Sequence, residues 1–330
     1  MTAPPLVLRP RALQPGDTVA VAALSGPLET AEVELYERGV AVIESFGLRV
    51  RPAPLVGLDK AWWWGAATPT EVAAEFNALL RDPDVRAIWA LTGGRFALSY
   101  LDRIDYAAVA ADPKPILGMS DVDALLLAIH AMTGLATVHA DLVTVGLGEW
   151  RDLDDPVQSQ WWDVYRRVLG VAEPAGPLPQ SARWEAWREG RATGRLIGGM
   201  LNRLIRVQAT PQAVPPERFD GAILFWEDIG TSSLAVWNDL HVLRQAGVFD
   251  RIAGMLVGAR STIETPRVLA GPTTLRDVVM EVVGDRDLPV IANVDIGHAG
   301  PNLPLPLGIA AEIDAGALTI WLNEAAVAPS

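Results

Sequence analysis

The sequence predicts an α/β protein with two domains. Short apolar, partly β-branched runs alternate with segments whose apolar residues recur at helical spacing, which is typical of a mainly parallel sheet covered by helices. Polar or glycine-containing turns follow several of these runs. The length of 330 residues corresponds to about two domains. We predict a first domain at 1–150, a linker region at 151–190 and a second domain at 191–330.

In the first domain, strands and helices are expected in alternation. The strands are predicted at 18–24, 48–50, 85–91, in the short run that ends at 118, and at 136–139, and the helices at 31–46, 70–81, near 98–101 and at 124–132. Three adjacent tryptophans at 62–64 cannot all face one core, so we expect at least one of them to line a cleft or an interface.

The linker region is rich in tryptophan, acidic residues and proline, and its pattern predicts a single helix at 158–169. The second domain repeats the alternation and ends in an antiparallel hairpin. The segment 194–197 leads into Gly198-Gly199. The strands of the domain are predicted at 222–226, 252–257, 289–294, 310–313 and 317–322, and its helices at 234–246 and 275–283.

Composition and charge argue against several classes of function. The net charge of −13 argues against binding to a nucleic acid polymer or to an anionic membrane surface. The chain has no cysteine, which excludes disulfides and thiol chemistry, and no His or Glu pair at ligand spacing, so we expect neither a metal nor another cofactor. The N-terminus lacks the apolar core of a signal peptide, and no apolar run is long enough for a membrane span; we therefore expect a cytoplasmic protein.

Ser120 lies where a nucleophile would be expected. The apolar run ends in Gly118-Met119-Ser120, and Asp121 then opens the next helical segment. In a strand–turn–helix arrangement the serine hydroxyl is exposed at the sheet edge, and the helix N-terminus offers N–H groups to a developing oxyanion. The second glycine of the full Gly-x-Ser-x-Gly pattern is absent, and a helix-capping role for Ser120 or Asp121 is the alternative interpretation.

Two further strand ends carry groups that could activate a serine. Glu227 follows the apolar run 222–226, and His298 follows 290–294 through a glycine-containing turn. A serine needs a base, and the base needs a partner that fixes its tautomer; the order Ser, acid, His is one known order of such triads. Glu227 could instead be a cap or an ion-pair partner, and His139, at another strand end, competes with His298 as the base.

Taken together, several segments resemble the LD-carboxypeptidase family of serine peptidases, which includes the microcin C self-immunity proteins. The segments span nearly the whole chain in family order, and they are Gly16–Val21, Val85–Trp89 with Gly93-Gly94, Pro115–Asp121, Gly198-Gly199, Gly221–Gly230, and Gly297-His298 with Asn302–Gly308. The resemblance implies an amidotransferase-like parallel-sheet N-terminal domain, a smaller swivelling-type β/α C-terminal domain and a homodimer.

For the site, the resemblance implies a triad of Ser120, Glu227 and His298. It also implies an oxyanion hole formed by the backbone N–H groups of Asp121 and Gly94. The chain departs from the family pattern at positions that border the expected cleft, namely Arg95-Phe96, Met200 and Thr231-Ser232.

We therefore expect a serine hydrolase of an amide bond near a free carboxylate. The substrate would be a murein tetrapeptide, cut before its terminal D-residue, or a peptide–nucleotide antibiotic conjugate; a non-catalytic binding homologue is the alternative from another class. Arg95, next to the glycine pair, is the candidate for binding the terminal carboxylate, unless it points to solvent. Residues near Asn202 are the second candidate.

Overall fold

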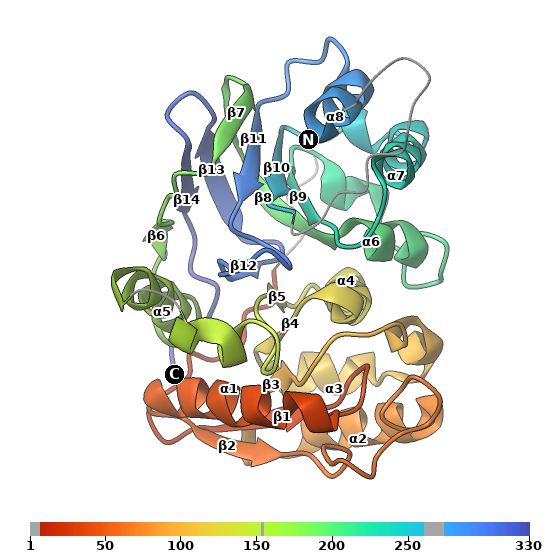
Figure 1. Cartoon of the computed structure of the whole chain (residues 1–330), viewed down its shortest axis with the longest axis vertical. Coiled ribbons are helices and arrows are strands. Elements are labelled where there is room, and N and C mark those ends of the chain that lie inside the picture. The colour runs from red at the N-terminus through yellow and green to blue at the C-terminus, as the bar shows by residue number, and fades with distance from the viewer. Residues whose placement is uncertain (1–6, 153–154, 261–273) are drawn as a thin grey trace.

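The computed structural model describes residues 7–152, 155–260 and 274–330. Two sheets with their helices form two halves of the molecule, and the predicted two-domain α/β fold is confirmed. In Figure 1 the first sheet lies below with α1 (Val33–Ser45), α2 (Pro69–Arg81) and α3 (Tyr106–Ala111), and the second lies above with α7 (Ser233–Gln245) and α8 (Leu275–Val283).

The first sheet is parallel except at one edge. Its strands, in spatial order, are β12 (Leu305–Pro306), β5 (Val138–His139), β4 (Ile116–Gly118), β3 (Val85–Ala90), β1 (Thr18–Ala22) and β2 (Arg49–Pro52). Only β12 runs antiparallel, against β5. Strands that are covered on both faces require continuous apolar runs, which explains the strong strand signals of β1 and β3. A short segment of the second half thus completes the first sheet.

Two helix boundaries of the first half carry common capping residues. The side chain of Thr68 accepts a hydrogen bond from the N–H of Glu71, and Pro69 opens α2. Helix α4 (Asp123–Thr133) ends at Gly134, which adopts a left-handed conformation with a φ of 76°. The helix expected near 98–101 is a 3₁₀ helix, Ala97–Arg103, and α3 was not predicted, because its six residues are too few to show helical periodicity.

The second sheet is mixed and has eight strands. In spatial order they are β6 (Gly176–Pro177), β14 (Thr319–Leu322), β13 (Ala310–Asp314), β8 (Arg191–Met200), β9 (Ile223–Glu227), β10 (Gly254–Gly258), β11 (Val290–Val294) and β7 (Glu185–Arg188). Strands β8 to β11 are parallel. The predicted closing hairpin is confirmed, since β13 and β14 pair antiparallel. Helix α6 (Leu201–Val207) follows β8 directly.

The region 151–190 contains more than the single expected helix, α5 (Asp155–Gly170). It also supplies β6 and β7, which occupy the two edges of the second sheet. Both strands are short, and they lack the apolar run by which buried strands are recognised, so the sequence pattern did not predict them. The domain boundaries themselves stay a prediction.

The two sheets approach each other at the carboxyl ends of their parallel strands. The backbone N–H of Met200, at the end of β8, donates to Asp123 at 2.7 Å, and the ring of Phe225 in β9 contacts His139 at the end of β5. Ligands of parallel sheets bind beyond such carboxyl ends. Within the described ranges, no helix combines the length and the apolar character needed to cross a membrane.

Candidate active site

Ser120 occupies a sharp turn between β4 and α4. Its φ is +64°, a left-handed conformation that is rare for residues other than glycine and is typical of a nucleophile elbow. The 3₁₀ turn Ser120–Val122 then leads into α4. A Cβ atom on Gly118 would lie 2.9 Å from the Val122 side chain and 3.0 Å from the Ala90 Cβ atom. Glycine is therefore required two residues before the serine by packing.

The Gly93-Gly94 loop after β3 lies against Ser120. A Cβ atom on Gly93 would be 2.9 Å from the Ser120 hydroxyl, so a side chain here would displace the serine. The loop is fixed by a hydrogen bond from the N–H of Gly26 to the Gly93 carbonyl at 2.9 Å. In the described part of the chain the N–H of Gly94 donates to no backbone acceptor outside the regular helices and strands, and that of Asp121 lies in the first turn of a helix, where N–H groups lack intrahelical acceptors.

His298 and Glu227 form a hydrogen-bonded pair. The Nδ1 atom of His298 lies 2.8 Å from Oε2 of Glu227, and the Glu227 side chain, at the end of β9, is fully buried. The Glu227 carboxylate fits here because residue 297 is glycine. A Cβ atom on Gly297, which has a φ of +91°, would lie 2.4 Å from the same carboxylate oxygen. Because an ionised carboxylate only accepts hydrogen bonds, Nδ1 carries a hydrogen, and in the neutral ring Nε2 is left as the acceptor.

Each partner of this pair favours the charge of the other. Burial alone would lower the pKa of His298, but the negative charge of Glu227 and the hydrogen bond to it raise that pKa above its ordinary value. Burial alone would raise the pKa of Glu227, but His298 outweighs this effect and holds the pKa low. Such a carboxylate can stabilise an imidazolium.

Ser120 and His298 line one cavity of about 320 Å³. Its wall also contains the glycine pair, and its other polar side chains include two carboxylates but, among the described residues, no basic side chain. The remaining lining residues are Gly26, Pro27, Glu29, Glu32, Trp64, Thr92, Leu142 and Val145. The structure thus brings together the predicted nucleophile, the base with its carboxylate partner, and the glycine loop, from four strand ends in two sheets.

His139, the competing base, is placed elsewhere. It is fully buried, its Nδ1 atom lies 2.9 Å from Oδ1 of Asp123, and it is not among the described residues that line the cavity. Burial alone would lower the pKa of His139, but the carboxylates of Asp123 and Glu227 raise it. The Asp123–His139 pair is therefore a second buried, hydrogen-bonded pair, and His139 also interacts electrostatically with Glu227.

A buried ion pair that was not predicted from the sequence joins the two halves of the molecule. Oδ1 of Asp121 accepts a hydrogen bond from Nε of Arg203 at 2.7 Å, and both side chains are almost completely buried. The other oxygen of Asp121 accepts from the Ser25 hydroxyl at 2.6 Å and from the N–H groups of Phe96 and Ala97 at 2.5 and 2.7 Å. One carboxylate therefore ties the nucleophile turn, the glycine loop and α6 together. The one sequence signal for this network was the acidic residue Asp121 directly after Ser120.

The two residues proposed for substrate binding lie outside the cavity wall. Arg95 follows the glycine pair, but its side chain is exposed. Asn202, in the first turn of α6, is half-buried, and its amide oxygen accepts a hydrogen bond from Arg203 at 2.6 Å. Their roles stay predictions.

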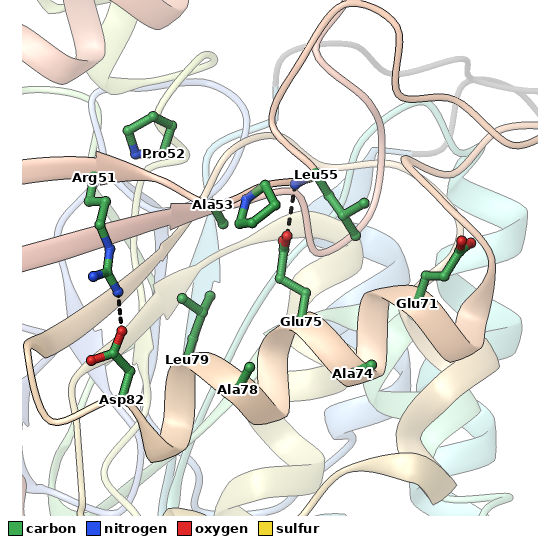
Figure 2. Close-up of a pocket in the computed structure, with 11 residues that line it drawn as sticks. Arg51, Pro52, Ala53, Leu55, Glu71, Ala74, Glu75, Ala78, Leu79 and Asp82 are labelled. Carbon is green, nitrogen blue, oxygen red and sulfur yellow. Dashed lines mark hydrogen bonds and ion pairs between the residues drawn. The ribbon is translucent and has the colours of Figure 1, made fainter.

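A larger cavity, of about 570 Å³, lies between the end of β2 and α2 (Figure 2). Its charged side chains already have partners: Arg51 pairs with Asp82 at 2.5 Å, and Glu75 accepts from the N–H of Leu55 at 2.7 Å. The described residues that line it include no serine, histidine or other nucleophile–base pair. The smaller cavity is therefore the candidate active site.

Two family models match this chain. Residues 19–140 match the family model of the LD-carboxypeptidase N-terminal domain, and residues 193–313 match that of the LD-carboxypeptidase C-terminal domain. The chain therefore belongs to the LD-carboxypeptidase family, a family of peptidases.

Individual relatives are similar over almost their whole length. A Vibrio cholerae protein named as a carboxypeptidase is 31% identical, covering 93% of this chain and 95% of that protein. The microcin C7 self-immunity protein of Escherichia coli is 29% identical, with 97% and 96% covered. A solved structure of a microcin C7 self-immunity protein in complex with aspartyl sulfamoyl adenosine superposes with a TM-score of 0.87 at 26% identity, covering 97% of this chain and 100% of that one.

Proposed function

We propose that this chain is a serine peptidase in which Ser120 attacks an amide carbonyl. Nε2 of His298 takes the hydroxyl proton, and Glu227 holds the ring and stabilises the imidazolium. The N–H groups of Gly94 and Asp121 would bind the oxyanion of the tetrahedral intermediate. His298 then protonates the leaving amine, an acyl-enzyme remains on Ser120, and water hydrolyses it. The observation that carries this proposal is the cavity shared by Ser120 and the Glu227-bonded His298.

The substrate we propose is a small peptide with an amide bond near a free carboxylate, such as the L,D bond of a murein tetrapeptide. The names of two relatives support this class: a murein peptide carboxypeptidase of Bacillus subtilis, 27% identical with 93% of this chain and 91% of that protein covered, and a murein tetrapeptide carboxypeptidase of Pseudomonas aeruginosa. Because the described residues of the cavity wall include no lysine or arginine, the carboxylate would have to be bound beside the wall, and Arg95 is the proposed residue.

A peptide–nucleotide antibiotic conjugate is the second candidate substrate. It is supported by the similarity to the microcin C7 self-immunity protein along the whole chain and by the solved complex of such a protein with an aminoacyl sulfamoyl nucleoside. We also propose that the chain forms a homodimer, as the family resemblance implies.

The test is hydrolysis of a murein tetrapeptide and of an aminoacyl sulfamoyl adenosine, followed by mass spectrometry, with wild type and Ser120→Ala. We expect wild type to cleave one of them and Ser120→Ala to cleave neither. Turnover that survives in Ser120→Ala would contradict the proposed nucleophile. Absence of turnover on both substrates would favour a non-catalytic binding homologue.

A further inference from the structure

The three adjacent tryptophans form a tight hairpin at the candidate active site. The backbone groups of Trp62 and Gly65 bond to each other in both directions, at 2.7 and 2.9 Å, so that Trp63 and Trp64 form the two-residue tip. Trp63 is 74% exposed and Trp64 is 60% exposed. Large apolar side chains at such exposure contribute little to a core, and their presence at a tip calls for another reason.

The hairpin holds these rings in place at a cost. Trp63 has a φ of +53°, a left-handed conformation that is usually occupied by glycine or asparagine in tight turns. The hairpin is anchored to the glycine loop, because the Trp62 ring packs edge-on against Phe96 with centroids 6.2 Å apart. A side chain on Gly65 would collide with the same Phe96 ring at 2.7 Å. The position of the tip is therefore fixed relative to Ser120 through residues 93–96.

The tip forms a continuous aromatic surface. The rings of Trp62 and Trp63 are stacked with centroids 4.0 Å apart, and those of Trp63 and Trp64 are tilted at 5.4 Å. Trp64 is also part of the wall of the cavity that contains Ser120 and His298. A flat group bound in this cavity could therefore extend onto the ring of Trp64.

We propose that Trp64, supported by Trp63, is a stacking subsite for a flat aromatic group of the substrate. Apart from His298, the chargeable side chains of the described wall are the carboxylates of Glu29 and Glu32, which disfavour an anionic ring, so the aromatic group is uncharged or positively charged. A purine base and an aromatic amino-acid side chain share this chemistry. The inference rests on the proposed function and favours its second candidate substrate, because a murein tetrapeptide has no aromatic ring whereas a peptide–nucleotide conjugate carries a base.

Two ligand pairs, each differing in one flat ring, test the subsite. The first pair is an N-acetylated dipeptide with phenylalanine against the same dipeptide with cyclohexylalanine. The second pair is an aminoacyl sulfamoyl adenosine against the same compound without its base. Cyclohexyl buries at least as much apolar area as phenyl, so a preference for phenyl reports stacking rather than burial. Binding is measured by calorimetry in the Ser120→Ala background, which does not consume the ligand.

We expect at least one pair to show about tenfold tighter binding of the flat member, and Trp64→Ala to remove that preference. Which pair responds identifies the source of the ring. Trp321→Ala is the matched control, since Trp321 is 44% exposed on β14 in the second sheet, and it should leave both preferences unchanged.

Absence of a flat-ring preference in both pairs, or a preference that survives Trp64→Ala, would overturn the inference. A change of sedimentation in Trp64→Ala with unchanged binding would also overturn it and would assign the tip to contact between two copies of the chain. Failure of the proposed function is separable: wild type would then hydrolyse neither the murein tetrapeptide nor the aminoacyl sulfamoyl adenosine, while the calorimetric preference and its loss in Trp64→Ala would persist.

Discussion

His139 is fully buried and His298 is partly buried, and each is bonded through Nδ1 to a carboxylate, yet only His298 lines the cavity with Ser120. Substituting asparagine at either position keeps an amide N–H near Nδ1 and removes Nε2. We expect His298→Asn to lower kcat by several orders of magnitude, as losses in a triad do, and His139→Asn to stay within about tenfold of wild type. Steady-state kinetics on folded protein, checked by circular dichroism, decide this. The reverse ranking would assign the base to His139.

The raised pKa of His298 predicts a pH dependence. His298 acts as a base only when neutral, so kcat/KM should rise with pH through a pKa above the ordinary value of about 6.5. The stability contributed by the raised pKa of His298 changes with pH in the opposite direction. It is fully present below the pKa that His298 has in the unfolded state, and it is lost as the pH rises through the pKa of His298 in the folded state. Glu227, whose pKa is lowered, contributes stability that is lost as pH falls through its folded pKa.

The measurement is a pH profile of kcat/KM together with urea unfolding at each pH. Glu227→Gln removes the carboxylate that raises the pKa of His298, so any residual activity should titrate at lower pH. A profile controlled by a pKa below the ordinary histidine value, or one that Glu227→Gln leaves unmoved, would contradict this reading of the pair.

At the scale of elements, glycines determine how closely the strand ends approach. Gly297 has a φ of +91°, and an added Cβ atom would meet Glu227 at 2.4 Å, whereas Gly221 has a φ of +66° and no atom within 4 Å. Gly221→Ala therefore isolates the cost of the left-handed backbone, about 1 kcal/mol or more of unfolding free energy. We expect Gly297→Ala to cost more than that and to reduce kcat, because it displaces the carboxylate. Equal effects of both substitutions on stability and no effect on kcat would contradict it.

Elements with their own local signals were predictable from the sequence. The run before Gly118 and the turn at Ser120 indicated the elbow, and the helical spacing at 124–132 indicated α4. Strands β6, β7 and β12 were missed, because they are two to four residues long and pair with distant segments at sheet edges. Pairing of that kind depends on tertiary contacts, which propensity does not encode.

For the whole molecule, the Asp121–Arg203 pair joins the two halves. Removing one partner of a buried pair leaves an uncompensated charge, so Arg203→Ala should lower the unfolding free energy by about 3–5 kcal/mol. Arg191, 77% exposed and paired with Asp314 at 2.6 Å, offers a surface control whose loss should cost about 1 kcal/mol or less. Chemical denaturation monitored by tryptophan fluorescence measures both. Similar small losses for the two variants would show that the buried pair does not stabilise the junction.

Only part of the candidate active site could be predicted from the sequence. Ser120, Glu227 and His298 each follow a recognisable apolar run, so their placement at strand ends could be predicted. Arg203 and the Asp123–His139 pair could not, because a buried charge is recognisable only once its partner is known, and Asp121 and Arg203 lie 82 positions apart. The exposure of the tryptophan tip likewise depends on the tight turn closed by Gly65.

The central claim is that Ser120 is a nucleophile activated by the His298–Glu227 pair. Its most direct test is the rate of labelling by a fluorophosphonate probe, with the modified residue identified by peptide mass mapping. We predict a single adduct, on Ser120, that is absent in Ser120→Ala and forms orders of magnitude more slowly in His298→Asn. An adduct on another residue, or labelling of Ser120 at an unchanged rate in His298→Asn, would contradict the claim.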